Sequence, residues 1–309
     1  MIRFHTIFNT FATGWYAILS KKELRKINKP LAIRRFELDL VLWRNKNKEI
    51  TALHDRCPHR SAKLSLGKIS DDKISCPFHG FQFDAHGTCV FAPEFAKAIP
   101  GLHVRKFVIH EAFGMVWLYY GDTPLPFSQP LLSDISQRFK GRYAQTSRTW
   151  QTHITRAIEN QLDYTHLPFV HKNTIGRNYY LPTAPRIELN DSLICAYLRT
   201  DQAQPTFTFI FPNIWILHIS DKLQLVVYFV PVDEQHTKFY LTTYRSFLNF
   251  KFLNFLFNFS NAIILNQDRT VVESQGNQPS YLVEGELLMK HDLAIKHFRN
   301  IWQASRIKN

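Results

Sequence analysis

The sequence predicts an α+β protein in which a small all-β domain precedes a larger domain of antiparallel sheet and helices. Short runs rich in β-branched and aromatic residues, broken by turn residues, fill residues 13–121. Pro and Gly cluster at residues 121–126, between strand-like runs, and mark a domain boundary. Longer strand-like runs and three helical segments follow. We therefore expect an arm at residues 1–12, a first domain at 13–121 and a second domain at 122–309.

The first domain is expected to consist of short strands joined by turns. Ser20 and Glu23 have the spacing of a capping box and predict a short helix. Residues 31–43 and 49–53 predict a β-hairpin that leads toward Cys57. Further short strands are predicted at residues 73–75, 80–83, 104–110 and 114–120.

The second domain is expected to begin with a strand at residues 143–152 and a helix at 153–167. Pro168 should end that helix, because proline disfavours helical backbone in the residue before it. A large antiparallel sheet is predicted from residues 187–199, 206–220 and 223–247, and helices from residues 248–275 and 284–302.

Composition describes a folded, soluble protein with a basic surface. The 309 residues are 45% hydrophobic and carry a formal net charge of +13. No nucleic-acid-binding motif accompanies this charge, so we favour a solvated face or a docking face for an acidic electron-transfer protein. We predict neither a signal peptide nor a transmembrane helix. The four cysteines do not form a disulfide framework, which predicts a reducing cytoplasm.

Two short loops each carry one cysteine and one histidine: Cys57 with His59, and Cys76 with His79. Unrelated loop residues would not be expected to repeat this pairing over so short a segment. A Cys₂His₂ zinc site usually pairs cysteine with cysteine and histidine with histidine. A [2Fe–2S] cluster with two thiolates on one iron and two imidazoles on the other needs both ligand types from each loop. The pattern favours the iron–sulfur cluster, with structural zinc as the alternative.

A second group of metal-binding residue types lies at Asp163, His166 and His171. A helix would place Asp163 and His166, three residues apart, on one face. His171 follows the break expected at Pro168 and could turn back toward them. Two imidazoles and one carboxylate form the facial triad of Fe(II) oxygenases, which leaves positions open for O₂.

Taken together, these motifs resemble those of the Rieske non-haem iron oxygenases. Residues 55–60, 64–67 and 76–84 resemble the family's Rieske domain, and residues 160–171 resemble its Asn-x₂-Asp-x₂-His-x₄-His signature, which begins at Asn160. The resemblance implies that one iron of the cluster is bound by Cys57 and Cys76, the other by His59 and His79, and the mononuclear Fe(II) by His166 and His171.

The same resemblance changes the role expected of Asp163. It implies that Asp163 is not a ligand but a carboxylate that bridges an iron-bound histidine to a Rieske histidine, usually across a subunit boundary. Phe78 and Phe81 depart from the family, which often has Tyr and Trp there, and this could alter the cluster's potential.

The third ligand of the mononuclear iron must then come from further along the chain. In the smaller members, which consist of α subunits alone, it is an Asp in a terminal helix of Asp-x-Ala character. Asp292, followed by Leu293 and Ala294, fits that pattern and is the preferred prediction. Asp268 is the alternative, in a segment that resembles a helix the family carries before its last ligand.

The resemblance implies a terminal oxygenase with a Rieske domain and a helix-grip, START-like catalytic domain. Its cofactors would be a [2Fe–2S] cluster and mononuclear Fe(II). Electrons would come from NAD(P)H through a separate reductase or ferredoxin, because the chain lacks a G-x-G-x-x-G fingerprint. Such an enzyme would hydroxylate or oxidatively demethylate an aromatic or other apolar substrate, and a homotrimer is implied. The alternatives are an electron-transfer protein with a degenerate second domain and a zinc-stabilised binding module.

A phenylalanine-rich segment at residues 247–259 has no place in these motifs. Such a run is more typical of a core or a subunit interface than of a substrate entrance or a membrane contact. We therefore do not expect membrane contact, although the segment would allow it.

Overall fold

The computed structural model describes residues 11–25, 29–140, 142–181, 185–199, 201–248 and 250–306. The chain forms two compact units, Ala17–Tyr119 and a larger unit that takes up the rest. The smaller unit lies within the range 13–121 expected for the first domain. Of the expected arm, residues 1–10 lie outside the described residues, whereas Phe11 and Ala12 are buried in the larger unit. The predicted α+β class is confirmed: an all-β unit and an antiparallel sheet with helices.

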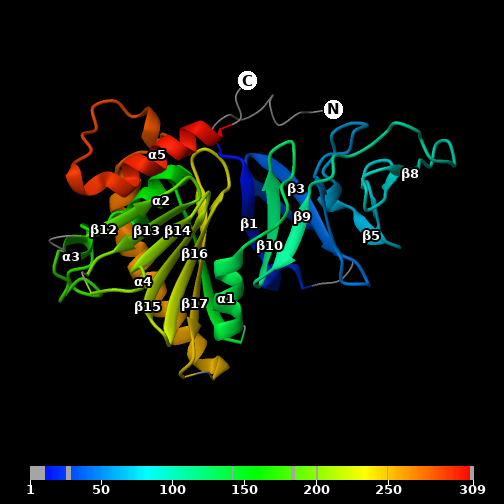
Figure 1. The fold of residues 1–309 in the computed structure, drawn as a ribbon. Coiled ribbons are helices and arrows are strands. Elements are labelled where there is room, and N and C mark those ends of the chain that lie inside the picture. Colours follow the sequence, from blue (N-terminus) through cyan, green and yellow to red (C-terminus); the bar gives the residue numbers. More distant parts are fainter. Residues whose placement is uncertain are drawn as a thin grey trace. The chain divides into compact units, whose positions relative to one another are not determined.

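The smaller unit contains three antiparallel sheets (Figure 1), in the orders β1-β10-β9, β2-β3-β4 and β5-β6-β7-β8. Short 3-10 turns η2 (Lys21–Leu24) and η3 (Leu64–Leu66) join them, and the capping box of Ser20 and Glu23 is confirmed. The strands are β1 (Gly14–Ser20), β2 (Leu31–Arg35), β3 (Leu38–Arg44), β4 (Ile50–His54), β5 (Lys68–Ser70), β6 (Lys73–Ser75), β7 (Gln82–Phe83), β8 (Cys89–Phe91), β9 (Ile109–Ala112) and β10 (Met115–Tyr120).

Two predicted strands of this unit are shorter in the structure. The segment 31–43 is two strands, because Phe36 and Glu37 both have left-handed backbone (φ 52° and 61°) and form a two-residue turn. That turn conformation usually uses Asn or Gly, so the sequence carried no signal for it. The segment 104–110 becomes a strand only from Ile109.

Cys57 and Cys76 belong to the core of the smaller unit, with Trp43, Leu64 and Phe83 among their buried neighbours. The backbone closes tightly around them at Gly67. A Cβ atom at this position would lie 1.9 Å from the carbonyl oxygen of Ser75, so no larger residue fits without moving the backbone. The end of strand β6, just before Cys76, therefore packs directly against the turn that ends at Gly67.

The larger unit is built on one seven-stranded antiparallel sheet, in the order β11-β17-β16-β15-β14-β13-β12. It confirms the large antiparallel sheet expected from the sequence. Its strands are β11 (Tyr143–Trp150), β12 (Arg186–Leu189), β13 (Leu193–Tyr197), β14 (Phe207–Ile210), β15 (Ile214–Ser220), β16 (Leu223–Pro231) and β17 (Thr237–Arg245).

Helices cover both faces of this sheet (Figure 1). On one face, the ring of Phe298 lies 5.5 Å from that of Phe209, and Asn261 donates a hydrogen bond to Thr243. On the other face, Phe139, which follows α1, contacts Tyr244. The helices are α1 (Pro130–Arg138), α2 (Ile154–Leu162), α3 (Leu167–Val170), α4 (Asn254–Ser274) and α5 (Leu293–Ser305), with short 3-10 turns η4 (Lys251–Leu253), η5 (Ser280–Leu282) and η6 (Lys290–Asp292).

The break between α2 and α3 lies earlier than predicted. We expected one helix over residues 153–167, but α2 ends at Leu162 and Asp163 caps it in extended backbone. The Asp163 carboxylate accepts hydrogen bonds from the N–H and hydroxyl of Thr165, which compete with helix continuation. Pro168 stands in the first turn of α3, where its fixed φ suits a helix start rather than an end.

Within the described ranges, none of the helices has both the length and the apolar character needed to cross a bilayer.

We predict that Gly67→Ala destabilises the smaller unit by at least about 3 kcal/mol, because its Cβ atom would collide with backbone rather than with a movable side chain. The matched control is Gly101→Ala. Gly101 has φ +78° but open space around it, so only the cost of left-handed backbone, about 1 kcal/mol, is expected. Urea unfolding followed by tryptophan fluorescence measures both. Equal losses in the two variants would contradict the steric argument.

Candidate metal centres

The two Cys–His loops of the smaller unit have the same backbone design. In each loop, the cysteine N–H donates to the carbonyl five residues further on, and the cysteine carbonyl accepts from the N–H four residues further on. The residue that makes this second bond has left-handed backbone in both loops. The pairs are Cys57 with Ala62 (2.8 Å) and Ser61 (2.9 Å), and Cys76 with Phe81 (2.8 Å) and Gly80 (3.0 Å).

These loops place two thiols inside and two imidazoles outside. Cys57 and Cys76 are buried side by side, and burial, with a further contribution from the Cys76 thiol, raises the pKa of Cys57 to about 11. His59 and His79 are exposed, with ring centroids 4.7 Å apart. Two adjacent thiols on one side and two adjacent imidazoles on the other are the donor set of a cluster whose two irons have different ligands. The residues therefore fit the cluster better than they fit a mixed tetrahedral zinc site.

Phe78 and Phe81, the two departures from the family pattern, contact the two histidines. The Phe78 ring lies 3.9 Å from that of His79 and beneath the Arg60 guanidinium, and the side chain is half exposed. The Phe81 ring is buried 5.1 Å from that of His59. At both positions the imidazole ring therefore contacts a phenyl ring, which offers no hydrogen-bond donor.

The larger unit gathers His166, His171 and Asp268 into one cluster, whose donor atoms all lie within 4.8 Å of one another. The Asp268 Oδ1 atom is 2.9 Å from His171 Nε2 and 3.5 Å from His166 Nε2. His166 and His171 flank α3, as the residues immediately before and after it. Asp268 projects from α4, on its buried stripe with Asn261, Ala262, Leu265 and Val272.

This geometry corrects the preference for Asp292 as the third ligand. Asp292 does not belong to the cluster; its carboxylate accepts the backbone N–H of Met289 at 2.7 Å and so caps the turn before α5. Asp268 takes the place that was predicted for Asp292. The sequence did carry a signal for Asp268. An acid on the mostly apolar face of a helix is expected to be buried, and a buried acid needs a partner.

The hydrogen bonds around His171 direct one of its ring nitrogens toward a metal ion. The Nδ1 atom of His171 lies 2.8 Å from Gln267 Oε1, which also accepts the Thr174 hydroxyl. An amide oxygen only accepts, so Nδ1 of His171 carries a proton, and in the neutral ring Nε2 carries the lone pair. Nε2 faces the Asp268 Oδ1 atom at 2.9 Å. A proton or a metal ion between these two atoms would satisfy both, and the third donor atom, from His166, makes a metal ion a fitting occupant.

The surrounding carboxylates add to this demand for positive charge. Burial alone would lower the pKa of His166, but its bonds to the Asp163 and Asp268 carboxylates outweigh burial and raise the pKa to about 9. Burial opposes ionisation of Asp268, yet its bonds to His166 and His171 lower its pKa below the usual range. An ionised carboxylate between two imidazoles is a ready ligand set for Fe(II).

Asp163 and Asn160, the two other residues singled out in the sequence, do not belong to the cluster of three. Asp163 Oδ2 is 3.6 Å from His166 Nδ1, on the side of the ring away from Asp268. Its side chain is 28% exposed, so the carboxylate can meet a further donor. The Nδ2 atom of Asn160 is buried and has no hydrogen-bond partner among the described residues.

A group of paired charges anchors α2, which precedes the cluster. Both carboxylate oxygens of the buried Glu159 accept hydrogen bonds from Arg299 on α5, and the Ser280 hydroxyl donates to one of them. Arg156 and Arg299 also bind Glu286, in the segment between η5 and η6. These bonds tie α2 to the two elements that follow α4. The turn that carries Asp163 and His166 therefore has a fixed starting point.

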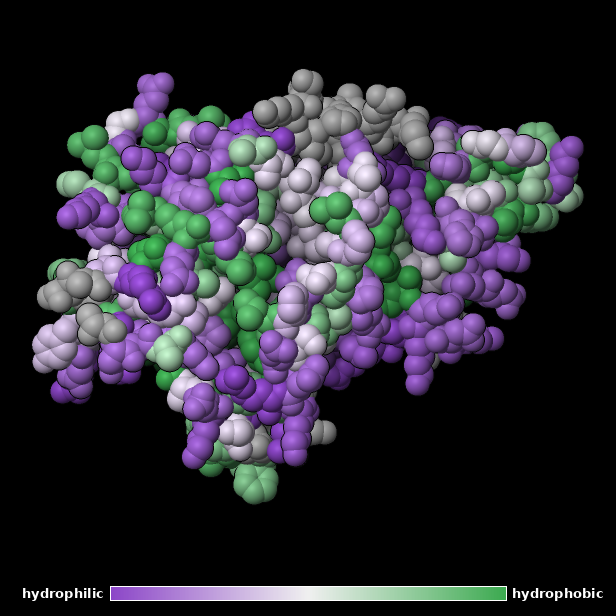
Figure 2. Space-filling view, in the orientation of Figure 1, coloured by the Kyte–Doolittle hydropathy of each residue, from purple (hydrophilic) through white to green (hydrophobic). Residues whose placement is uncertain are grey.

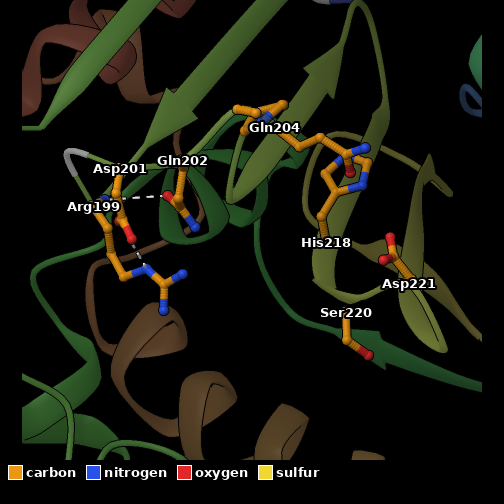
Figure 3. A pocket seen from close by; sticks show the side chains of 9 residues that line it. Arg199, Asp201, Gln202, Gln204, His218, Ser220 and Asp221 are labelled. Atoms are coloured by element: carbon orange, nitrogen blue, oxygen red, sulfur yellow. Dashed lines mark hydrogen bonds and ion pairs between the residues drawn. The ribbon is translucent and has the colours of Figure 1, made fainter.

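A polar hollow of about 350 Å³ lies elsewhere in this unit, between the β13–β14 connection and the β15–β16 turn (Figure 3). None of the three cluster residues lines it. Arg199 lies 3.7 Å from Asp201, and the Arg199 backbone N–H donates to the Gln202 side chain. The third charged group, Asp221, lies 3.8 Å from Arg138. We assign no role to it.

Comparison with known families agrees with both centres. Residues 14–107 match the Rieske [2Fe-2S] domain, and residues 150–214 match the C-terminal domain of the vanillate O-demethylase oxygenase. The chain therefore carries a Rieske domain followed by an oxygenase domain, the arrangement of the Rieske non-haem iron oxygenases. It is an oxidoreductase of that type, with the Rieske [2Fe–2S] cluster and the mononuclear iron as its cofactors.

Similar proteins of this family include two demethylases. The chain is 29% identical to methylxanthine N1-demethylase of Pseudomonas putida over 284 residues, which are 84% of this chain and 80% of that protein. It is 29% identical to the oxygenase component of dicamba O-demethylase of Stenotrophomonas maltophilia, over 62% of this chain and 57% of that protein.

Solved structures share the fold of this Rieske oxygenase over almost its full length. Dicamba monooxygenase bound to dicamba aligns with a TM-score of 0.77 at 20% identity and covers 97% of this chain and 99% of that one. The Pseudomonas putida methylxanthine N1-demethylase aligns with a TM-score of 0.73 at 25% identity, over 97% of this chain and 96% of that one.

We predict that Gln267→Leu weakens Fe(II) binding about 10- to 100-fold, because His171 loses the acceptor that holds its Nδ1 proton and its ring orientation. Gln267→Glu should retain binding, since a carboxylate accepts the same hydrogen bond. Asn266→Leu is the matched control, because Asn266 is the exposed preceding residue of the same helix. Competition with a chelator measures the affinity, and unchanged affinity in Gln267→Leu would remove the positioning role.

Proposed function

We propose that this chain is a terminal oxygenase whose mononuclear iron is held by His166, His171 and Asp268. The observation that carries the proposal is the convergence of two imidazole nitrogens and one carboxylate oxygen on a single point. The same chain supplies a second donor set in Cys57, His59, Cys76 and His79, which we propose as the ligands of the Rieske cluster. An electron-transfer protein with a degenerate second domain would not need the set formed by His166, His171 and Asp268.

The surrounding residues have distinct positioning roles in this proposal. Gln267 fixes the proton of His171 on Nδ1, so that Nε2 is free to bind metal. Asp163 Oδ2 lies 3.6 Å from the outer nitrogen of His166, in ion-pair contact with it. Gln161, 3.5 Å from the second oxygen of Asp268, restrains that carboxylate. Asn160 lies in the last turn of α2 with a buried Nδ2 atom that has no hydrogen-bond partner among the described residues, and we propose that it donates to a group bound at the site. When bound, the iron supplies O₂ activation with electrons that the Rieske cluster delivers.

We further propose that Asp163 connects His166 to a Rieske histidine of a neighbouring chain in a homotrimer. Its partly exposed carboxylate supports this role, because one oxygen is committed to Thr165 and the other remains available beside His166. The exposed edges of His59 and His79 suit such a contact.

Oxidative demethylation of an aromatic or similarly apolar substrate is the reaction we favour. Relatives of this chain are by name N- and O-demethylases. In O-demethylation, a methyl ether, O₂, two electrons and two protons yield the alcohol, formaldehyde and water. The electrons would come from NAD(P)H through a reductase or ferredoxin. The four free cysteines are those of a protein of a reducing compartment, and we propose a cytoplasmic location.

The purified protein provides the first test. A Rieske oxygenase is expected to be red-brown, with about three irons and two acid-labile sulfides per chain, since a two-iron cluster and one mononuclear iron are bound. A surrogate reductase with NADH and methylated aromatic compounds should then release formaldehyde. A colourless protein that contains zinc would favour the binding module. A coloured protein without substrate-dependent O₂ uptake would favour the electron-transfer protein.

Asp268→Asn is expected to lower mononuclear iron occupancy at least about 10-fold while the Rieske absorption stays unchanged, because an amide is a poorer ligand than a carboxylate for Fe(II). Asp292→Asn is the matched control and should retain iron, since an amide oxygen can still accept the Met289 N–H. Iron analysis and visible spectra distinguish the two. The reverse pattern of iron loss would restore Asp292 as the ligand.

Asp163→Asn is expected to keep both metals and both spectra but to lower coupled turnover by about 100-fold, because the residue acts through His166 and not on the metal. Single-turnover experiments with a pre-reduced Rieske cluster measure the rate at which electrons leave it. Wild-type rates in the variant would show that Asp163 is not part of the connection.

A further inference from the structure

Exposed apolar side chains crowd the start of α4 and the loop before it. We call this group the Phe-rich tip; it consists of Phe247, Leu248, Phe250, Phe252, Phe255, Leu256 and Phe259, all exposed. Phe252 and Phe255 are 69% and 63% exposed. Figure 2 shows hydrophobic side chains bordered by hydrophilic ones at the lower end of the molecule, where Figure 1 places the start of α4.

The fold does not use this tip for its own packing. The first buried residue of α4 is Asn261, so the opening two turns of the helix, all of them described residues, bury no side chain. Polar and cation–π contacts hold this segment instead. Arg245 donates to Asn254 and to the carbonyl of Leu248, and its guanidinium lies 4.1 Å from the Phe257 ring centroid. The segment is therefore fixed with its other phenyl rings directed outward, although exposed apolar groups of this size are unfavourable in water.

The charge around the tip is positive. No Asp or Glu occurs between residues 246 and 267, and Arg245 lies at the base of the tip. Lys222 is exposed on the neighbouring turn, where its carbonyl accepts the Ser246 N–H. The nearby acid Asp221 lies 3.8 Å from Arg138 and is thus partly neutralised.

We propose that the Phe-rich tip docks on a membrane surface that contains anionic lipid. Phenyl rings and leucines that enter the boundary between headgroups and acyl chains, with lysine and arginine left at the phosphates, are the pattern of interfacial binding without a membrane span. A two-fold contact with a second copy of this chain is a poorer fit, because it would bring two positive borders together. A head-to-tail contact in a trimer is the rival that the light-scattering experiment tests. The tip and Asp268 share α4, thirteen residues from Phe255, or about 20 Å along the helix axis. Docking would therefore hold the iron site near the lipid surface, where apolar substrates dissolve.

The test is co-sedimentation of the whole protein with vesicles. Wild-type protein is expected to bind vesicles of phosphatidylcholine mixed with phosphatidylglycerol, to bind pure phosphatidylcholine more weakly, and to be partly released by salt. The double variant Phe252→Ser/Phe255→Ser should lower partitioning into the mixed vesicles at least about 10-fold. The matched control Phe95→Ser/Leu125→Ser removes two exposed apolar side chains elsewhere and should bind like wild type. Circular dichroism checks that each variant is folded.

Light scattering in lipid-free buffer measures the molar mass and so tests the alternative that a second copy of the chain covers the tip. An unchanged molar mass in the folded double variant, together with lost vesicle binding, supports the membrane surface. A fall in molar mass would assign the tip to a subunit interface and overturn the proposal. So would a wild-type protein that ignores anionic vesicles, or a folded double variant that binds them as wild type does. None of these measurements depends on the metals or on turnover.

Discussion

The catalytic unit depends on one electrostatic constraint: the buried carboxylate of Asp268 is held against the imidazole rings of His166 and His171. Asp268 Oδ1 and His171 Nε2 are 2.9 Å apart, and the Oε1 atom of Gln267 lies 2.8 Å from the other ring nitrogen of His171. A buried carboxylate is unfavourable unless positive charge or hydrogen-bond donors meet it. The packing of α4 against the sheet and the anchoring of α2 by Glu159 and Arg299 hold these groups together. The fold thus presents three donor atoms in the arrangement that a divalent metal ion fits.

The Rieske unit holds its candidate ligands in place with backbone hydrogen bonds. Its two loops repeat one pattern of backbone hydrogen bonds, so each cysteine and histidine is presented in the same way. The thiols point into a core that also contains Trp43 and Phe83, while the imidazoles remain outside. Burial keeps the sulfur side dry, and exposure keeps the imidazole side within reach of another protein surface. A path for electrons needs both conditions.

Local features of the sequence were predicted well where local interactions decide them. The capping box at Ser20 and the Cys–His loops depend on residues that are near neighbours along the chain, and so do the β-rich runs of the large sheet. The prediction failed where two local preferences compete. Pro168 can follow the end of one helix or stand in the first turn of another. The hydrogen bonds from Thr165 to Asp163 end α2 early, so Pro168 stands in the first turn of α3. Phe36 and Glu37 adopt a turn for which neither residue has an intrinsic preference.

By itself, the sequence determined the fold class and the family, and it singled out the two histidines that the structure brings together, because these rest on short spacings and on the polar pattern of each segment. Only the tertiary structure placed Asp268, and not the preferred Asp292, beside His166 and His171. That choice depends on which helix face packs against the sheet, and long-range packing is not encoded in any local spacing. The same holds for the Phe-rich tip, whose composition is that of a core and whose exposure became visible only once α4 was seen to begin beyond the sheet.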